Sequence, residues 1–200
     1  MRTPYAKLMP SSLLGALVFA AGVASCSSDP TLSNLVKRQG PEADGVPKGE
    51  FHRSGQQCLA CHISGGPAKP EFSMAGTVYL RPPTAQQRDI VGVDQVEVLL
   101  IDSAGNTKRV NTNCVGNFYI PRSDPWKPRY PVRVAVFKEG FGRQTMQSLI
   151  GRDGSCATCH AFERALDSAG VVYLTTDANA QYTPPEDCPV DPVITLPDPE

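Results

Sequence analysis

The stretch VDQVEVLLI, at residues 93–101, carries the clearest structural signal in the chain. From Val96 to Leu100, apolar residues alternate with other residues, which is the two-residue period of a strand with one buried face. PVRVAVFK at residues 131–138 repeats this period, and SMAGTVYL at residues 73–80 has the composition of a third strand. These runs predict a mainly β chain.

Turn-forming sequences separate the strand-like runs. DSAGN occupies residues 102–106, VGN residues 115–117 and KEG residues 138–140. The 19 prolines and 17 glycines of the chain also cluster outside the apolar runs. Several short strands at this spacing predict a small β-sandwich.

The order of these segments resembles the carboxypeptidase regulatory-like, transthyretin-like family. The matching segments are AGTVY (75–79), the run at 93–101, DSAG (102–105), GNFY (116–119) and the run with its Gly ending at 132–140. The resemblance covers residues 73–148 and implies a transthyretin-like or immunoglobulin-like sandwich that binds or scaffolds, not a particular activity. The long loop at 81–92 and the proline-rich segment at 121–131 depart from the pattern, so another small sandwich remains the alternative.

The N-terminus has the features of an export signal. Arg2 and Lys7 precede an apolar stretch at residues 13–23, and VASC then places small residues ahead of Cys26. The stretch is shorter than the ~20 residues that span a bilayer, and its ending resembles a bacterial lipobox. That resemblance implies removal of residues 1–25 and acylation of Cys26, hence a lipoprotein held on a membrane, in the periplasm or on the outer-membrane surface. An ordinary signal peptide is the alternative.

The charge balance gives no indication of nucleic-acid binding. The whole chain has a formal charge of -1. Loss of residues 1–25 leaves 17 basic against 20 acidic residues, a formal -3. A protein without a basic excess is poorly suited to polyanions.

Four of the seven cysteines form two C-x-x-C pairs, each followed by histidine. The sequences are CLACH at residues 58–62 and CATCH at residues 156–160. C-x-x-C-H is the signature of c-type haem attachment, in which two thiols add to the vinyl groups of one porphyrin and the histidine ligates iron. The chain is therefore expected to carry two covalently bound haem c groups, attached through Cys58, Cys61, Cys156 and Cys159, with His62 and His160 as iron ligands.

Zinc binding and dithiol chemistry are the alternatives for C-x-x-C. Zinc ribbons also use two such pairs, but with a short gap, whereas Cys61 and Cys156 lie far apart in the chain. A thioredoxin-like motif needs a β-α-β context and no following histidine. Haem attachment accounts best for both pentapeptides.

Three residues are candidates for the sixth iron ligands. The chain has three histidines, so His52 is the only one outside the motifs, and Met74 and Met146 are the only methionines after residue 26. Each methionine is separated from a motif by a glycine-containing loop, and methionine is a known axial ligand; filling the core is its commoner role. His52 competes with Met74, provided that Gly55 interrupts any helix linking His52 to the first motif. An unligated His52 also remains open.

Cys114 and Cys188 are left over and are expected to form a disulfide in an oxidising compartment, pinning the tail to the sandwich. The rest of the tail from Tyr182 has the composition of an extended or disordered acidic segment. Within the segment after Cys26, residues 32–38 are compatible with a helical turn or two. The expected organisation is a signal peptide (1–25), a tether (26–50), a first haem segment (51–72), the sandwich (73–148), a second haem segment (149–175) and a proline-rich acidic tail (176–200).

These features together predict a dihaem lipoprotein that transfers electrons between other redox proteins, without a catalytic residue of its own. A dihaem enzyme of the peroxidase kind is the main alternative, and would need an open iron site with an acid-base group beside it. A surface binding module with structural haems is the third possibility.

Overall fold

The computed structural model describes residues 29–42, 45–84, 87–162 and 168–196. The chain divides into two compact units, residues 1–38 and residues 39–200. Among the described residues, no helix is both long enough and apolar enough to cross a membrane.

The described part of the first unit is the helix α2, Pro30–Arg38. The Asp29 side chain accepts a hydrogen bond from the Thr31 backbone N–H at 2.8 Å, which caps the helix start. Lys37 and Arg38 lie in the last turn, where positive charge complements the helix dipole. The helical turns predicted for residues 32–38 are therefore confirmed.

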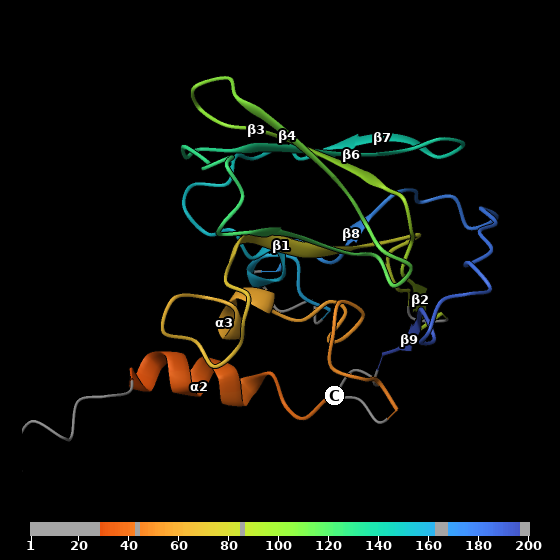
Figure 1. Cartoon of the computed structure of the whole chain (residues 1–200). Coiled ribbons are helices and arrows are strands. Elements are labelled where there is room, and N and C mark those ends of the chain that lie inside the picture. Colours follow the sequence, from red (N-terminus) through yellow and green to blue (C-terminus); the bar gives the residue numbers. More distant parts are fainter. Residues whose placement is uncertain (1–28, 43–44, 85–86, 163–167, 197–200) are drawn as a thin grey trace, which may run out of the picture. The chain divides into compact units, whose positions relative to one another are not determined.

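The second unit is a β-sandwich of two layers (Figure 1). One sheet has the strand order β4-β3-β6-β7 and the other the order β5-β1-β8, while β2 and β9 form a separate pair. The bounds are β1 (Phe72–Tyr79), β2 (Asp89–Val91), β3 (Glu97–Ile101), β4 (Thr107–Asn111), β5 (Asn117–Pro121), β6 (Arg133–Lys138), β7 (Gly142–Thr145), β8 (Val172–Tyr173) and β9 (Val193–Thr195). The predicted mainly β class and small sandwich are confirmed.

Alternate residues of β3 and β6 supply much of the core. Val98 and Leu100 of β3 are fully buried, and Val98 pairs with Val136 of β6. Strand β3 begins only at Glu97, later than the sequence predicts, because Gln95 has a positive φ of 49°. The Val96 backbone N–H therefore binds the Thr112 hydroxyl at 2.9 Å instead of joining the sheet.

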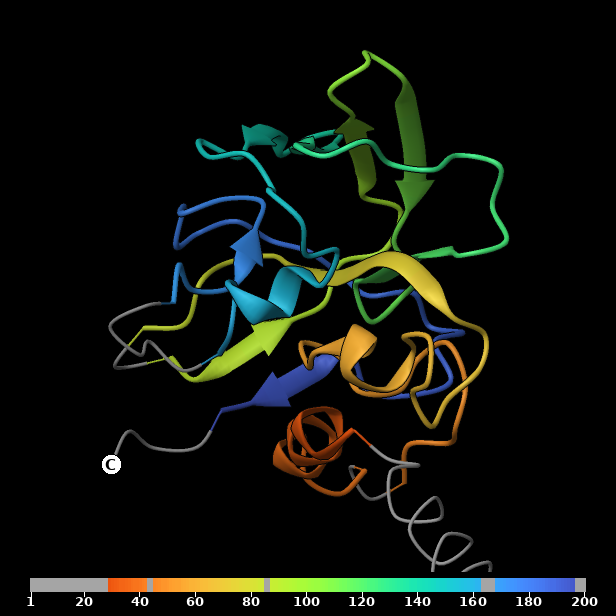
Figure 2. The same ribbon diagram turned by 90° about the vertical axis from the view of Figure 1, so that its left-hand side faces the viewer.

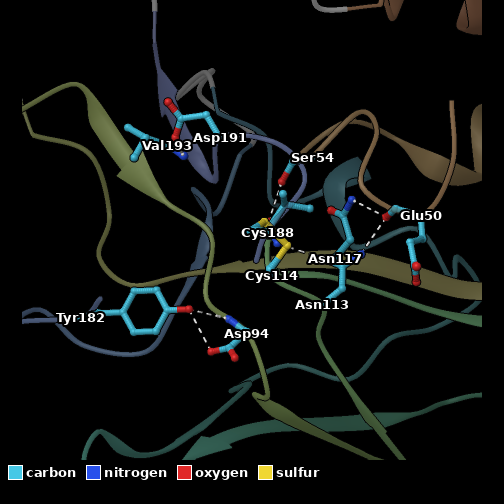
Figure 3. Close-up of a disulfide and its surroundings, with 11 residues drawn as sticks. Glu50, Ser54, Asp94, Asn113, Cys114, Asn117, Tyr182, Cys188, Asp191 and Val193 are labelled. Carbon is cyan, nitrogen blue, oxygen red and sulfur yellow. Dashed lines mark hydrogen bonds between the residues drawn. A yellow bond between two sulfur atoms is a disulfide. The ribbon is translucent and has the colours of Figure 1, made fainter. Parts of the chain in front are cut away.

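In its described part, up to Leu196, the C-terminal tail is extended, with β9 as its only regular element, and it folds back on the sandwich. The predicted disulfide between Cys114 and Cys188 is present (Figure 3). The Tyr182 hydroxyl donates a 2.8 Å hydrogen bond to Asp94, and β9 pairs with β2. The contacts of Tyr182 and β9 were not predicted, because each joins residues far apart in the chain.

Candidate cofactor sites

The two C-x-x-C-H sequences fold into the same turn. The first forms the one-turn helix α3, Cys58–Cys61, and the second forms the 3-10 turn η1, Cys156–Thr158. In both, the histidine backbone N–H donates to the carbonyl of the first cysteine, His62 to Cys58 and His160 to Cys156, each at 2.9 Å. Each motif therefore presents two cysteines and one imidazole from a single turn.

The two histidines also share a side-chain contact. Nδ1 of His62 lies 2.6 Å from the Pro70 carbonyl oxygen, and Nδ1 of His160 lies 2.7 Å from that of Gly170. A carbonyl can only accept, so Nδ1 carries the hydrogen and Nε2 keeps a free lone pair. Histidines that bind a metal are usually held in this way by their second ring nitrogen. Burial also lowers the pKa of His62, which favours the neutral ring.

After each motif the chain returns in the same way and enters a strand. The Ala68 N–H donates to the Cys61 carbonyl at 3.1 Å, and the Ala169 N–H donates to the Cys159 carbonyl at 2.8 Å. Strand β1 follows the first return and β8 the second, and these strands pair in parallel. The chain thus contains the same local unit twice, side by side in one sheet.

The first motif lines a cavity of about 500 Å³. Cys58, Cys61 and His62 lie on its wall together with His52, and β5 contributes residues on the other side. The ring centroids of His52 and His62 are 5.9 Å apart, with their planes at 21°. Phe72 stacks on His62 at 4.2 Å and fixes the orientation of that ring. The structure therefore brings together the two imidazoles that the sequence left ten residues apart.

The second motif lines a cavity of about 660 Å³. Its wall includes Cys156, Cys159 and His160 from the motif, Met146 from the segment after β7, and residues of β6 and β8. Met146 is fixed at this position by its backbone N–H, which donates to the Val134 carbonyl at 3.0 Å. Met146 and His160 consequently face one space.

Both motifs lie against strand β1 (Figure 2). Cys156 packs so closely on Gly76 that a Cβ atom at position 76 would stand 2.7 Å from its Cβ and 2.8 Å from its Sγ. Phe118, which lines the first cavity, packs in the same cluster as Cys156. Burial raises the pKa of the Cys156 thiol to about 12. Phe118 therefore joins the first cavity to the core cluster on which Cys156 packs.

The residues present fit two haem groups. The four motif cysteines are free thiols, unlike Cys114 and Cys188, and each pair opens on a cavity of several hundred Å³ with an available imidazole nitrogen. Within the described ranges, no three or more His, Cys, Asp or Glu residues gather to hold a metal ion. The two C-x-x-C pairs accordingly do not converge on one four-ligand zinc site. A porphyrin brings four nitrogen ligands of its own and needs only axial ones.

Two other residues singled out in the sequence lie elsewhere. Met74 is fully buried in the core between the sheets and lines neither cavity, so the structure gives it the core-filling role. Cys26 lies outside the described residues.

Two residues of the site region were not identified from the sequence. Gly76 gives Cys156 room beside β1, and Asn117 holds the loop that carries His52. Both had only a weak signal in the sequence. Gly76 lies inside β1 and Gly116 comes directly before Asn117, and glycine inside or beside a strand often marks a close approach.

Comparison with protein-family models, with curated proteins and with solved structures gave no match, so the local geometry of the two motifs carries the functional argument.

Proposed function

We propose that this chain is a dihaem c-type cytochrome that is anchored to a membrane through acylated Cys26 and relays electrons between redox proteins in the periplasm or at the outer-membrane surface. One observation carries the proposal: the motif turn, the histidine-to-carbonyl hydrogen bond and an adjoining cavity occur together twice. When bound, haem supplies reversible one-electron chemistry.

The residues of each motif have separate tasks in this proposal. Cys58 and Cys61, or their counterparts in the second motif, hold the group covalently, which suits an exported protein that would otherwise lose it. His62 offers Nε2 to the iron while the Pro70 carbonyl fixes its ring. The shared contact with β1 supports electron transfer between the two sites, because short separation favours it.

The sixth ligand position of the haem iron distinguishes the electron relay from the peroxidase-like alternative. A peroxidase-like enzyme needs an iron with an open position and a distal acid-base group, and His52 is the sole imidazole in the chain outside the motifs. If His52 binds iron, it is not available for that role. The relay is therefore the function that we favour.

The proposal is tested by counting covalent haems. The full chain is produced in a bacterium that assembles c-type cytochromes, and haem is measured after denaturation by mass and by the pyridine haemochrome spectrum. We expect two haems per chain, and one haem in each of the double variants Cys58→Ala/Cys61→Ala and Cys156→Ala/Cys159→Ala. The matched control Cys114→Ser/Cys188→Ser removes two cysteines outside the motifs and should keep both haems. A colourless chain, or one that binds stoichiometric zinc, would contradict the proposal.

The anchor is tested separately. We expect labelled palmitate to be incorporated into the wild-type chain and not into Cys26→Ser, which should leave the membrane fraction if it is still exported. Incorporation that persists in Cys26→Ser would refute the anchor without touching the haem proposal.

A further inference from the structure

The two motif histidines share the Nδ1 contact with a carbonyl, but the other residues that line their cavities differ. In the first cavity, His52 faces His62 with ring centroids 5.9 Å apart and planes at 21°. Two imidazoles bound through nitrogen to one metal have centroids about 6 Å apart, since each metal–nitrogen bond is about 2 Å. The observed centroid separation is close to that value, but the two rings are stacked, so the His52 ring would turn in place to direct Nε2 at an iron held in the cavity.

The loop that carries His52 is fixed to the sandwich by a polar network. Nδ2 of Asn117 donates to the carbonyl oxygens of His52 at 3.1 Å and Glu50 at 3.3 Å. The Thr77 hydroxyl donates to Oδ1 of Asn117 at 2.7 Å and accepts the Gly55 N–H at 2.8 Å. Asn117 and Thr77 are both buried. Buried networks whose members are satisfied are rigid, so His52 has a defined position over the cavity.

One existing contact must change if His52 binds iron through Nε2. The Gly49 N–H donates to Nδ1 of His52 at 3.2 Å, which places the ring hydrogen on Nε2. Binding through Nε2 moves that hydrogen to Nδ1 and breaks this exposed bond. Loss of one long, exposed hydrogen bond is a small cost beside the strength of a metal–imidazole bond.

In the second cavity a thioether takes the corresponding place. Met146 and His160 line the same space, and the backbone of Met146 is tied to β6 through Val134. Met74, the other methionine after residue 26, is committed to the core. Methionine ligation raises the reduction potential of haem iron relative to histidine ligation.

Given the proposed function, on which this inference rests, we infer that His52 is the sixth ligand at the first site and Met146 the sixth ligand at the second, so that electrons pass from the first site to the second. With haem bound at both sites, one electron would leave the first iron, which would be oxidised, and enter the second iron, which would be reduced. A reduced cytochrome or similar donor refills the first site, and an oxidised redox protein empties the second. The ligand difference gives the relay a direction.

The test uses the full-length, haem-loaded chain in detergent. The oxidised protein should show the long-wavelength methionine-to-iron absorption band, which Met146→Leu should abolish and the control Met74→Leu should retain in full. His52→Ala should convert one of the two irons to high spin in low-temperature electron paramagnetic resonance, while the methionine band stays. In a potentiometric titration the wild type should give two separate one-electron waves, and Met146→His should bring them together.

The possible failures are distinguishable. A methionine band that survives in Met146→Leu or disappears in Met74→Leu overturns the assignment at the second site. Two low-spin irons in His52→Ala, or a wild-type first site that is already high spin and reacts with hydrogen peroxide, overturns it at the first. The two methionine-band outcomes, and two low-spin irons in His52→Ala, leave the proposed function standing as long as two covalent haems are present. A high-spin first site that reacts with hydrogen peroxide favours the peroxidase-like alternative instead, and a chain without covalent haem removes the proposed function itself.

Discussion

The disulfide between Cys114 and Cys188 closes a loop with a sequence separation of 74 residues. Replacing both cysteines by serine should lower the free energy of unfolding, because the unfolded chain gains the freedom that the bridge denied it. The chain-entropy relation gives about 4.5 kcal/mol at 25 °C for a loop of this length. Other tail contacts, such as the Tyr182 hydrogen bond to Asp94, survive in the folded variant and do not replace the lost constraint. We expect a measured loss of about 2 to 4.5 kcal/mol.

The assay is urea unfolding of wild type and Cys114→Ser/Cys188→Ser at pH 7, followed by far-ultraviolet circular dichroism. The single variant Cys188→Ser is the control, since the bridge is already absent from it and its stability should lie close to that of the double variant. A loss below about 1 kcal/mol, or a single variant as stable as wild type, would refute the reasoning from chain entropy.

Three further changes are predicted from the same structure. Gly76→Ala places a Cβ atom 2.7 Å from Cβ of Cys156, so we expect a loss of about 1–3 kcal/mol in urea unfolding and a fall from two covalent haems to one. Asn117→Ala removes the donors that hold the His52 loop and should cost about 1–3 kcal/mol, with faster hydrogen exchange in residues 49–57. The hydrogen bond from Lys108, at 2.5 Å, holds the pKa of Asp124 below its usual value. The pair therefore stabilises the fold above the unfolded pKa of about 3.9, and this stability is lost as pH falls through the lower pKa of the folded protein. Urea midpoints of wild type and Lys108→Met should accordingly differ at pH 6 and converge near pH 2.

Local patterns in the sequence were enough to predict several features. Val98 and Leu100 of β3, like Val134 and Val136 of β6, stand at every second position because one face of each strand is buried, and the same period is visible without a structure. Both C-x-x-C-H turns form from hydrogen bonds within five residues, so the spacing of the cysteines and histidine in the sequence is enough to predict the turn. The disulfide followed by elimination, since Cys114 and Cys188 had no other assigned role.

Features that depend on distant contacts were not predictable in the same way. The pairing of β9 with β2 joins residues more than a hundred positions apart, and neither strand exceeds three residues. Met74 and Met146 had equivalent positions relative to the motifs, yet the first lies between the sheets and the second beside a cavity. Strand alternation decided this outcome: Met74 shares the inward face of β1 with Val78, whereas Met146 follows the end of β7.

The distinction between local and distant contacts also explains why the two motifs are alike while the rest of each cavity lining differs. In each motif the described residues make the same three local contacts: the turn from the first cysteine to the histidine, the return bond to the second cysteine, and the bond from the histidine ring to a carbonyl about ten residues on. The rest of each cavity lining comes from whatever the sandwich supplies there: the loop before the first motif in one case and the segment after β7 in the other. Parallel pairing of β1 with β8 sets the two motifs side by side, and it places no symmetry on the rest of the lining. A repeated local motif on an unsymmetrical sandwich therefore produces two cavities that share a motif histidine and differ in the other residues that line them.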